Sequence, residues 1–156
     1  MAEPVRAAEA EGDRFGQAAM HVSLGVIEWD WGHPREATRH HTRVLDISRE
    51  LGWATGVASA YGGLAQAEWS MARLESAHEH VTIGLRIARE TANRPLEALG
   101  QVVLGVTCRD LGRLREAADH LELAISRNEE IGWNDDSLAL QNLGWVIVDV
   151  SPEQTL

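Results

Sequence analysis

The amino-acid sequence predicts an all-α protein, an antiparallel helix-pair solenoid of about three and a half repeats. The first observation is that the chain resembles itself when it is shifted by 40 residues, with small residues meeting small ones and apolar residues meeting apolar ones. Self-similarity at a fixed period of about 20–50 residues is typical of repeat architectures. The second is that apolar residues within each unit recur at helical spacing. The clearest aligned sets are Ala18, Ala58 and Ala98; Leu24, Leu64 and Leu104; Ala37, Ala77 and Ala117; and Glu50, Glu90 and Glu130.

A single domain, 1–156, is predicted to contain repeats at 18–57, 58–97 and 98–137. Each repeat has a first helix, the A helix, and a second, the B helix. In the third repeat Pro95 suits the first turn of the A helix, and Gly112 stops that helix. The B helix follows with one apolar stripe and ends at Gly132. The turns between helices are short, so the A and B helices must pack antiparallel.

The two ends of the chain are predicted to be incomplete repeats. Residues 5–16 align with the end of a B helix, and residues 138–150 begin a fourth A helix. The β-branched run 146–148 weakens the helix prediction there and leaves an apolar face. Either the chain is part of a longer array, which we favour, or the bare face pairs with another chain. Self-association through the C-terminal helix is expected in both cases.

The segment Leu104–Ile125 resembles the core of a tetratricopeptide repeat, with leucine and glycine early in the A helix, glycine at the turn and alanines in the B helix. The family's tyrosine near the end of the A helix is replaced by Glu28, Glu68 and Cys108, and the period is 40 instead of about 34. Repeat ends such as residues 48–53 (SRELGW) are similar to those of large bacterial transcriptional regulators, including actinobacterial ones. The resemblance implies a tetratricopeptide-like superhelix in a bacterial regulatory protein, where it binds other proteins.

Composition excludes several classes of function. The formal net charge of −10 argues against direct nucleic-acid binding, which requires a basic face. All 14 basic residues are arginines, so there is no lysine for a P-loop or a Schiff base. No apolar run approaches the ~20 residues of a membrane span, and no signal peptide is recognisable. The single cysteine, Cys108, favours a cytoplasmic location, and its predicted burial makes it an inert thiol.

Three histidines, His33, His40 and His41, surround Glu36 and could form a metal site. The repeat register favours a different interpretation, because it places His33 in a turn and His41 at a core position. His40 aligns with His80 and His120, one histidine per repeat. Neighbouring helices lie ~8–10 Å apart, so such a ladder does not converge on one ion. We therefore predict no metal and no cofactor, and we interpret these imidazoles as filling a semi-buried slot at the repeat interface, with a modest pH sensitivity.

The tryptophans indicate a candidate partner-binding groove. Trp29 and Trp69 align with Arg109 on the A-helix face that is concave in similar proteins, and Trp145 joins them after a one-residue slip. A partly acidic row lies beside this stripe. The candidate groove comprises Trp29, Asp30, Gln66, Trp69, Val106, Arg109, Asp110, Gln141, Trp145 and Asp149. An amphipathic helix or an arginine-rich segment of a partner would suit it. The alternative, that Trp29 and Trp69 only pack against neighbouring A helices, is equally open.

The remaining tryptophans, Trp31, Trp53 and Trp133, are predicted to be packing residues. The carboxylate clamp of similar proteins requires lysine, which this chain lacks, and no serine, histidine or carboxylate pair recurs at a catalytic spacing. The sequence therefore predicts a noncatalytic protein–protein interaction module. The alternatives are a sensor of a small ligand or signal peptide and, third, a homodimerisation scaffold.

Overall fold

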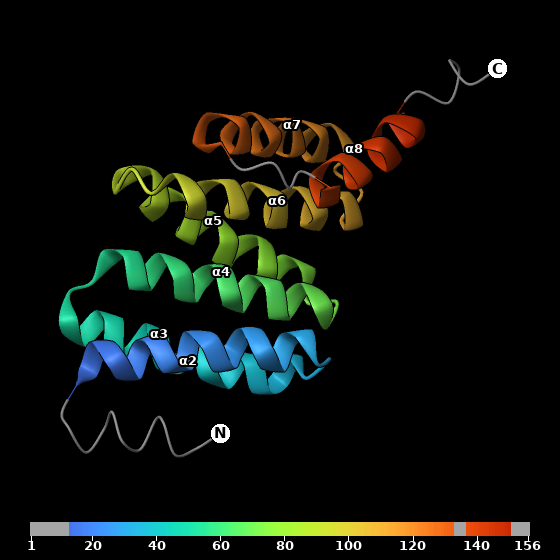
Figure 1. Ribbon diagram of the computed structural model, residues 1–156. Helices are drawn as coiled ribbons and strands as arrows, with labels where there is room; N and C mark the ends of the chain where they lie inside the picture. Colours follow the sequence, from blue (N-terminus) through green and yellow to red (C-terminus); the bar gives the residue numbers. More distant parts are fainter. Residues whose placement is uncertain (1–12, 133–136, 151–156) are drawn as a thin grey trace.

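The computed structural model describes residues 13–132 and 137–150, and all of the secondary structure in these ranges is α-helical. The helices are α2 (Arg14–Asp30), α3 (Pro34–Leu51), α4 (Ala54–Ser70), α5 (Leu74–Glu90), α6 (Arg94–Asp110), α7 (Leu114–Ile131) and α8 (Ser137–Val150). Helices adjacent in sequence pack as antiparallel pairs and stack one pair on the next (Figure 1). This arrangement confirms the predicted helix-pair solenoid.

The A helices α2, α4, α6 and α8 form one layer of the stack. Each touches the next A helix directly, whereas the B helices α3, α5 and α7 contact one another far less. The A helices are thus the more closely spaced layer, as on the inner side of a curved stack. A residue on the exposed side of one A helix therefore lies near the corresponding residue of the next.

Capping side chains and left-handed glycines define several of the helix ends. The Asp13 carboxylate accepts a hydrogen bond from the Gly16 amide at 2.7 Å, and the Asn93 side chain accepts one from Leu96 at 3.2 Å, which caps α2 and α6. Gly52 and Gly132 adopt left-handed conformations at the ends of α3 and α7, where a side chain would be strained.

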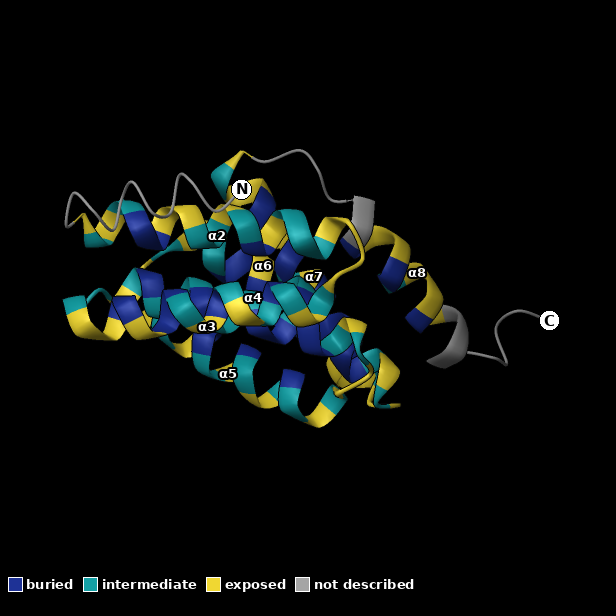
Figure 2. Ribbon diagram, turned by 90° about the horizontal axis from the view of Figure 1, so that it is seen from below, coloured by how far each residue is buried: buried dark blue, intermediate teal, exposed yellow. Residues whose placement is uncertain are grey.

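The core lies between the layers. Ala37, Ala77 and Ala117 at the start of the three B helices are fully buried, and their small side chains let the A and B helices approach closely. Figure 2 shows buried residues on the helix sides that face into the stack and exposed residues on the outer sides. Among the described helices, none combines the length and apolarity needed to cross a bilayer.

Two details of the helix boundaries differ from the sequence predictions. The helix pairs begin at residues 14, 54 and 94, four residues before the predicted repeat boundaries, because a periodic pattern does not define its own starting point. Residues 14–16 consequently form the first turn of α2 instead of a turn after a B helix, and residues 5–12 lie outside the described part. Helix α8 agrees with the predicted fourth A helix at 138–150 and continues through the β-branched run to Val150.

The prediction that Trp31 packs in the core is wrong. Trp31 is the C-cap residue of α2 and 65% exposed, whereas the equivalent residues Met71 and Leu111 are half-buried. The position lies where the chain leaves the A helix, and the neighbouring elements cannot cover a side chain as large as an indole. Trp53 packs edge-on against Phe15, with ring centroids 5.5 Å apart, and Trp133 lies outside the described residues.

Candidate functional site

The tryptophans of the candidate groove connect successive A helices. Trp29 Nε1 at the end of α2 donates a hydrogen bond to Ser70 Oγ at the end of α4, at 2.6 Å. Trp69 Nε1 at the end of α4 donates one to Asp110 Oδ2 at the end of α6, at 2.7 Å. Both acceptors lie 41 residues after their donors. The same bond therefore repeats from one A helix to the next.

Arg109 holds the equivalent position on α6 and also contacts the next A helix, but its acceptor lies 33 residues on instead of 41. Its guanidinium donates a hydrogen bond to Asn142 Oδ1 on α8, and its Nε donates one to Asp110 Oδ1 at 2.7 Å. We call the three connections Trp29–Ser70, Trp69–Asp110 and Arg109–Asn142 the A-helix ladder. The ladder joins all four A helices along one face, and both indoles stay partly exposed. The two tryptophans thus pack against neighbouring A helices, and they retain surface that a partner could contact.

The acidic row beside the stripe is less acidic than the sequence suggests. Asp110 forms an ion pair with Arg109, at 2.6 Å between Oδ1 and the guanidinium, besides accepting from Trp69. Asp30 is exposed, and the side chain of Asp149 lies outside the described part of the chain. Asp110 is exposed, but its charge is balanced by Arg109, whereas Asp30 is exposed and forms no ion pair with the described residues.

The other groove residues differ in their exposure to solvent. Val106 is 5% exposed, so it supports the surface from beneath. Gln66 is half-buried, and Gln141 is exposed. Trp145 on α8 is 62% exposed, the most open tryptophan of the stripe.

A small apolar pocket lies on the same side of the A helices, and nothing in the sequence analysis anticipated it. Its volume is about 40 Å³, and it lies between α4, α5 and α6. Ser59 and Gly62 line it from α4, and these residues precede Gln66 and Trp69 at helical spacing on one face. Leu99, 49% exposed, lines it from α6. The signal in the sequence was Gly62, since a glycine in a helix often leaves space for an approaching group.

His40, His80 and His120 each contact a side chain within their own helix pair, and the three imidazoles do not converge on one point. His40 Nδ1 lies 3.0 Å from His21 Nδ1 on α2, His80 Nδ1 lies 2.7 Å from a Glu68 oxygen on α4, and His120 Nδ1 lies 2.8 Å from Gln101 Oε1 on α6. Each partner belongs to the A helix of the same pair, so the slot is inside a pair and not at the interface between repeats.

His41 is 4% exposed, which confirms its predicted core position. Burial, with a smaller contribution from the charge of His40, lowers the pKa of His41 to about 4. Cys108 is also buried, as predicted, and is a free thiol. Burial, followed by the neighbouring Glu116 carboxylate, raises the pKa of Cys108 to about 11. The neutral forms of both groups are therefore favoured at neutral pH.

Comparisons with known proteins identify the fold and no more. No protein-family model matches the chain, and no curated protein sequence is significantly similar to it. The crystal structure of the apo form of RapI, a helical repeat protein, superposes with a TM-score of 0.79 at 20% sequence identity. The match covers 97% of this chain and 56% of the RapI chain. This chain has a helical repeat fold similar to that of RapI.

Proposed function

We propose that this protein is a noncatalytic protein-interaction module that binds a segment of a partner protein on the A-helix face. The A-helix ladder carries the proposal. It holds two partly exposed indoles and a guanidinium in fixed positions on one face. A surface that is ordered before binding loses less entropy when the partner arrives.

The pocket indicates what kind of partner fits. Sites for drug-sized ligands have volumes of roughly 300–1,000 Å³. The pocket between α4, α5 and α6 has a volume of about 40 Å³, so it could hold one small apolar side chain of a partner. This supports a peptide segment over a small molecule. A signal-peptide sensor would use the same face, and the two functions differ in whether the solenoid changes shape on binding.

The partner segment would combine one apolar anchor with a basic side chain elsewhere along its length. The anchor enters the pocket beside Leu99, and Asp30 offers the exposed carboxylate of the acidic row. The buried carboxylates are occupied within the protein, which supports a role without catalysis. Glu97, for example, is 2% exposed and lies 2.9 Å from Arg94 and 3.4 Å from Arg127. A role in a bacterial regulatory system extends the proposal and is supported by the tetratricopeptide resemblance.

A homodimerisation scaffold is the second candidate function, because α8 exposes Leu140, Trp145 and Ile147 by 51–62%. Light scattering over a concentration series tests it. A monomer at every concentration would contradict the second candidate and leave the first unaffected.

The proposed function is tested by selecting peptides from a random displayed library against the purified protein. The selected peptides are then titrated against Leu99→Glu, which places a charge at the pocket, and Trp69→Phe, which keeps an aromatic ring and removes the hydrogen bond to Asp110. Glu122→Gln on the exposed side of α7 is the matched control. We expect at least tenfold weaker binding for Leu99→Glu, a smaller loss for Trp69→Phe and no change for the control. Equal binding by all variants, or no enriched peptide, would contradict the proposal.

A further inference from the structure

One position on the A helices contacts the B helix of its own pair in the second and third repeats, through different chemistry in each. In the second pair Glu68 accepts a hydrogen bond from Ser76 Oγ at 2.9 Å. In the third pair the equivalent residues are Cys108 and Glu116, and the Cys108 sulfur lies 4.0 Å from Glu116 Oε2. Cysteine thus replaces the carboxylate of the A helix, and a carboxylate replaces the hydroxyl of the B helix.

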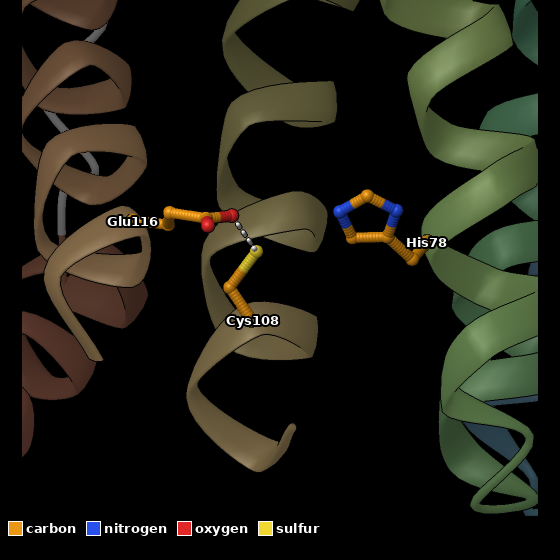
Figure 3. Close-up of side chains that lie close together, drawn as sticks. All are labelled: His78, Cys108 and Glu116. Atoms are coloured by element: carbon orange, nitrogen blue, oxygen red, sulfur yellow. Dashed lines mark hydrogen bonds between the residues drawn. The ribbon is translucent and has the colours of Figure 1, made fainter. Parts of the chain in front are cut away.

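A third side chain reaches this place from the preceding pair. His78 projects from α5 with one ring nitrogen pointing toward the Cys108 sulfur and the Glu116 carboxylate (Figure 3). One ligand atom from each of the three residues lies within 4.8 Å of the other two. No hydrogen bond within the described part of the chain occupies the His78 ring. The ring, the thiol and the carboxylate therefore face a common point.

We propose, in contrast to the sequence prediction of no metal, that His78, Cys108 and Glu116 bind one Zn²⁺ ion, with water as the fourth ligand. A thiolate, an imidazole and a carboxylate are the three donor types that zinc uses in proteins, and three protein ligands with one open position form a complete tetrahedral site. The negative charges of the thiolate and the carboxylate balance the two positive charges of the ion. The thiol proton passes to solvent as the metal–sulfur bond forms.

The ligands move a short distance to close around the ion. Zinc–ligand bonds of about 2.0–2.3 Å imply ligand atoms roughly 3.3–3.8 Å apart in a tetrahedron. In the structure the three ligand atoms lie within 4.8 Å of one another. Glu116 is exposed and His78 half-buried, so rotation of these two side chains supplies the movement. Cys108, fully buried, is the fixed ligand.

The site would join two neighbouring pairs, because its ligands come from α5, α6 and α7. The equivalent residues at the preceding junction are Thr38, Glu68 and Ser76, which offer neither nitrogen nor sulfur. Of these two junctions between the described helix pairs, the second is therefore the one with ligands for a metal link. It acts at a different place from the A-helix face and does not depend on the proposed function.

The test is a titration of the full-length, chelator-treated protein with Co²⁺, a spectroscopic substitute for zinc. We expect one ion per chain, a thiolate-to-cobalt charge-transfer absorption, and displacement by Zn²⁺ but not by Mg²⁺. Cys108→Ser should abolish the absorption. His78→Gln and Glu116→Gln should each weaken binding at least tenfold. Glu79→Gln, an exposed carboxylate beside His78, is the control and should bind as wild type does.

A titration without the charge-transfer absorption, or equal affinity in the control and the three ligand variants, would overturn the proposal. His78→Gln and Glu116→Gln alter side chains that are not buried, so the proposal can still be refuted if Cys108→Ser does not fold. Circular dichroism of every variant identifies such a case.

Discussion

The middle helix pair differs from the pairs on either side of it at three equivalent positions. The first and third pairs carry glycine at these positions, and the middle pair carries alanine. The sets are Gly25, Ala65 and Gly105; Gly32, Ala72 and Gly112; and Gly52, Ala92 and Gly132. The replacement is the same in each set, but its physical consequence is not.

At the first position the A helix faces the B helix across the core. A Cβ atom on Gly105 would lie 2.6 Å from Leu121 Cγ, and one on Gly25 would lie 2.6 Å from a ring nitrogen of His41. The residue of the middle pair that is equivalent to Leu121 and His41 is the smaller Val81, so Ala65 fits. Glycine beside a large residue and alanine beside a small one fill the same space, since cores respond to total volume.

At the other two positions the backbone conformation, not side-chain packing, determines the effect of alanine. Ala72 has φ 58° and Ala92 has φ 51°, both left-handed, and no smaller neighbour can relieve that strain. The same glycine-to-alanine replacement is therefore neutral at position 65, where it affects packing, and costly at positions 72 and 92, where it strains the backbone. Three predictions test this comparison, starting with the largest expected effect.

His41→Leu gives the first pair the glycine–leucine combination of the third and removes a buried titratable group. The pKa of His41 is lowered from 6.5 to about 4, so its stabilising contribution is complete above pH 6.5 and is lost as the pH falls toward 4. At about 1.4 kcal/mol per pKa unit, the wild type should lose about 3 kcal/mol of unfolding free energy relative to His41→Leu between pH 7 and pH 4. Urea denaturation at several pH values measures this difference.

The difference between the two proteins isolates His41, because every other titrating group is present in both. Parallel pH profiles for wild type and His41→Leu would contradict the prediction and would indicate that the imidazole is not held neutral by burial.

Gly105→Ala should destabilise the third pair by about 1–3 kcal/mol, because the new methyl group overlaps Leu121. Adding Leu121→Val recreates the combination of the middle pair and should recover part of the loss. Urea denaturation of the two single variants and the double variant forms a double-mutant cycle. Additive effects of the two changes would show that the residues do not share a space.

Ala72→Gly and Ala92→Gly should each stabilise the protein by about 0.5–1 kcal/mol, because glycine adopts positive φ without strain and this gain exceeds the added entropy of the unfolded chain. Thermal denaturation measures the gain. Gly112→Ala, at the turn position equivalent to Ala72, is the reverse control and should lower the melting temperature. A loss of stability in both glycine variants would mean that these turns are not strained.

The fold and the equivalent placement of Trp29 and Trp69 could be predicted from the sequence. The 40-residue register placed Trp29 and Trp69 at equivalent positions, and the structure has both on the A-helix face. Their hydrogen-bond acceptors could not be predicted, since each lies one residue beyond the repeat period on a different helix. The exposure of Trp31 was missed for a related reason, because alignment with smaller residues says nothing about whether the turn can cover an indole.

The sequence by itself determined the helices, their pairing and the stripes that face the core, because periodicity and helix-ending residues act over a few turns of chain. Only the tertiary structure decided which side chains meet between pairs. The contact of Trp69 with Asp110 and the approach of His78 to Cys108 and Glu116 both depend on how one pair sits against the next. That geometry results from packing the whole stack, in which a displacement of an ångström or two makes or breaks a contact.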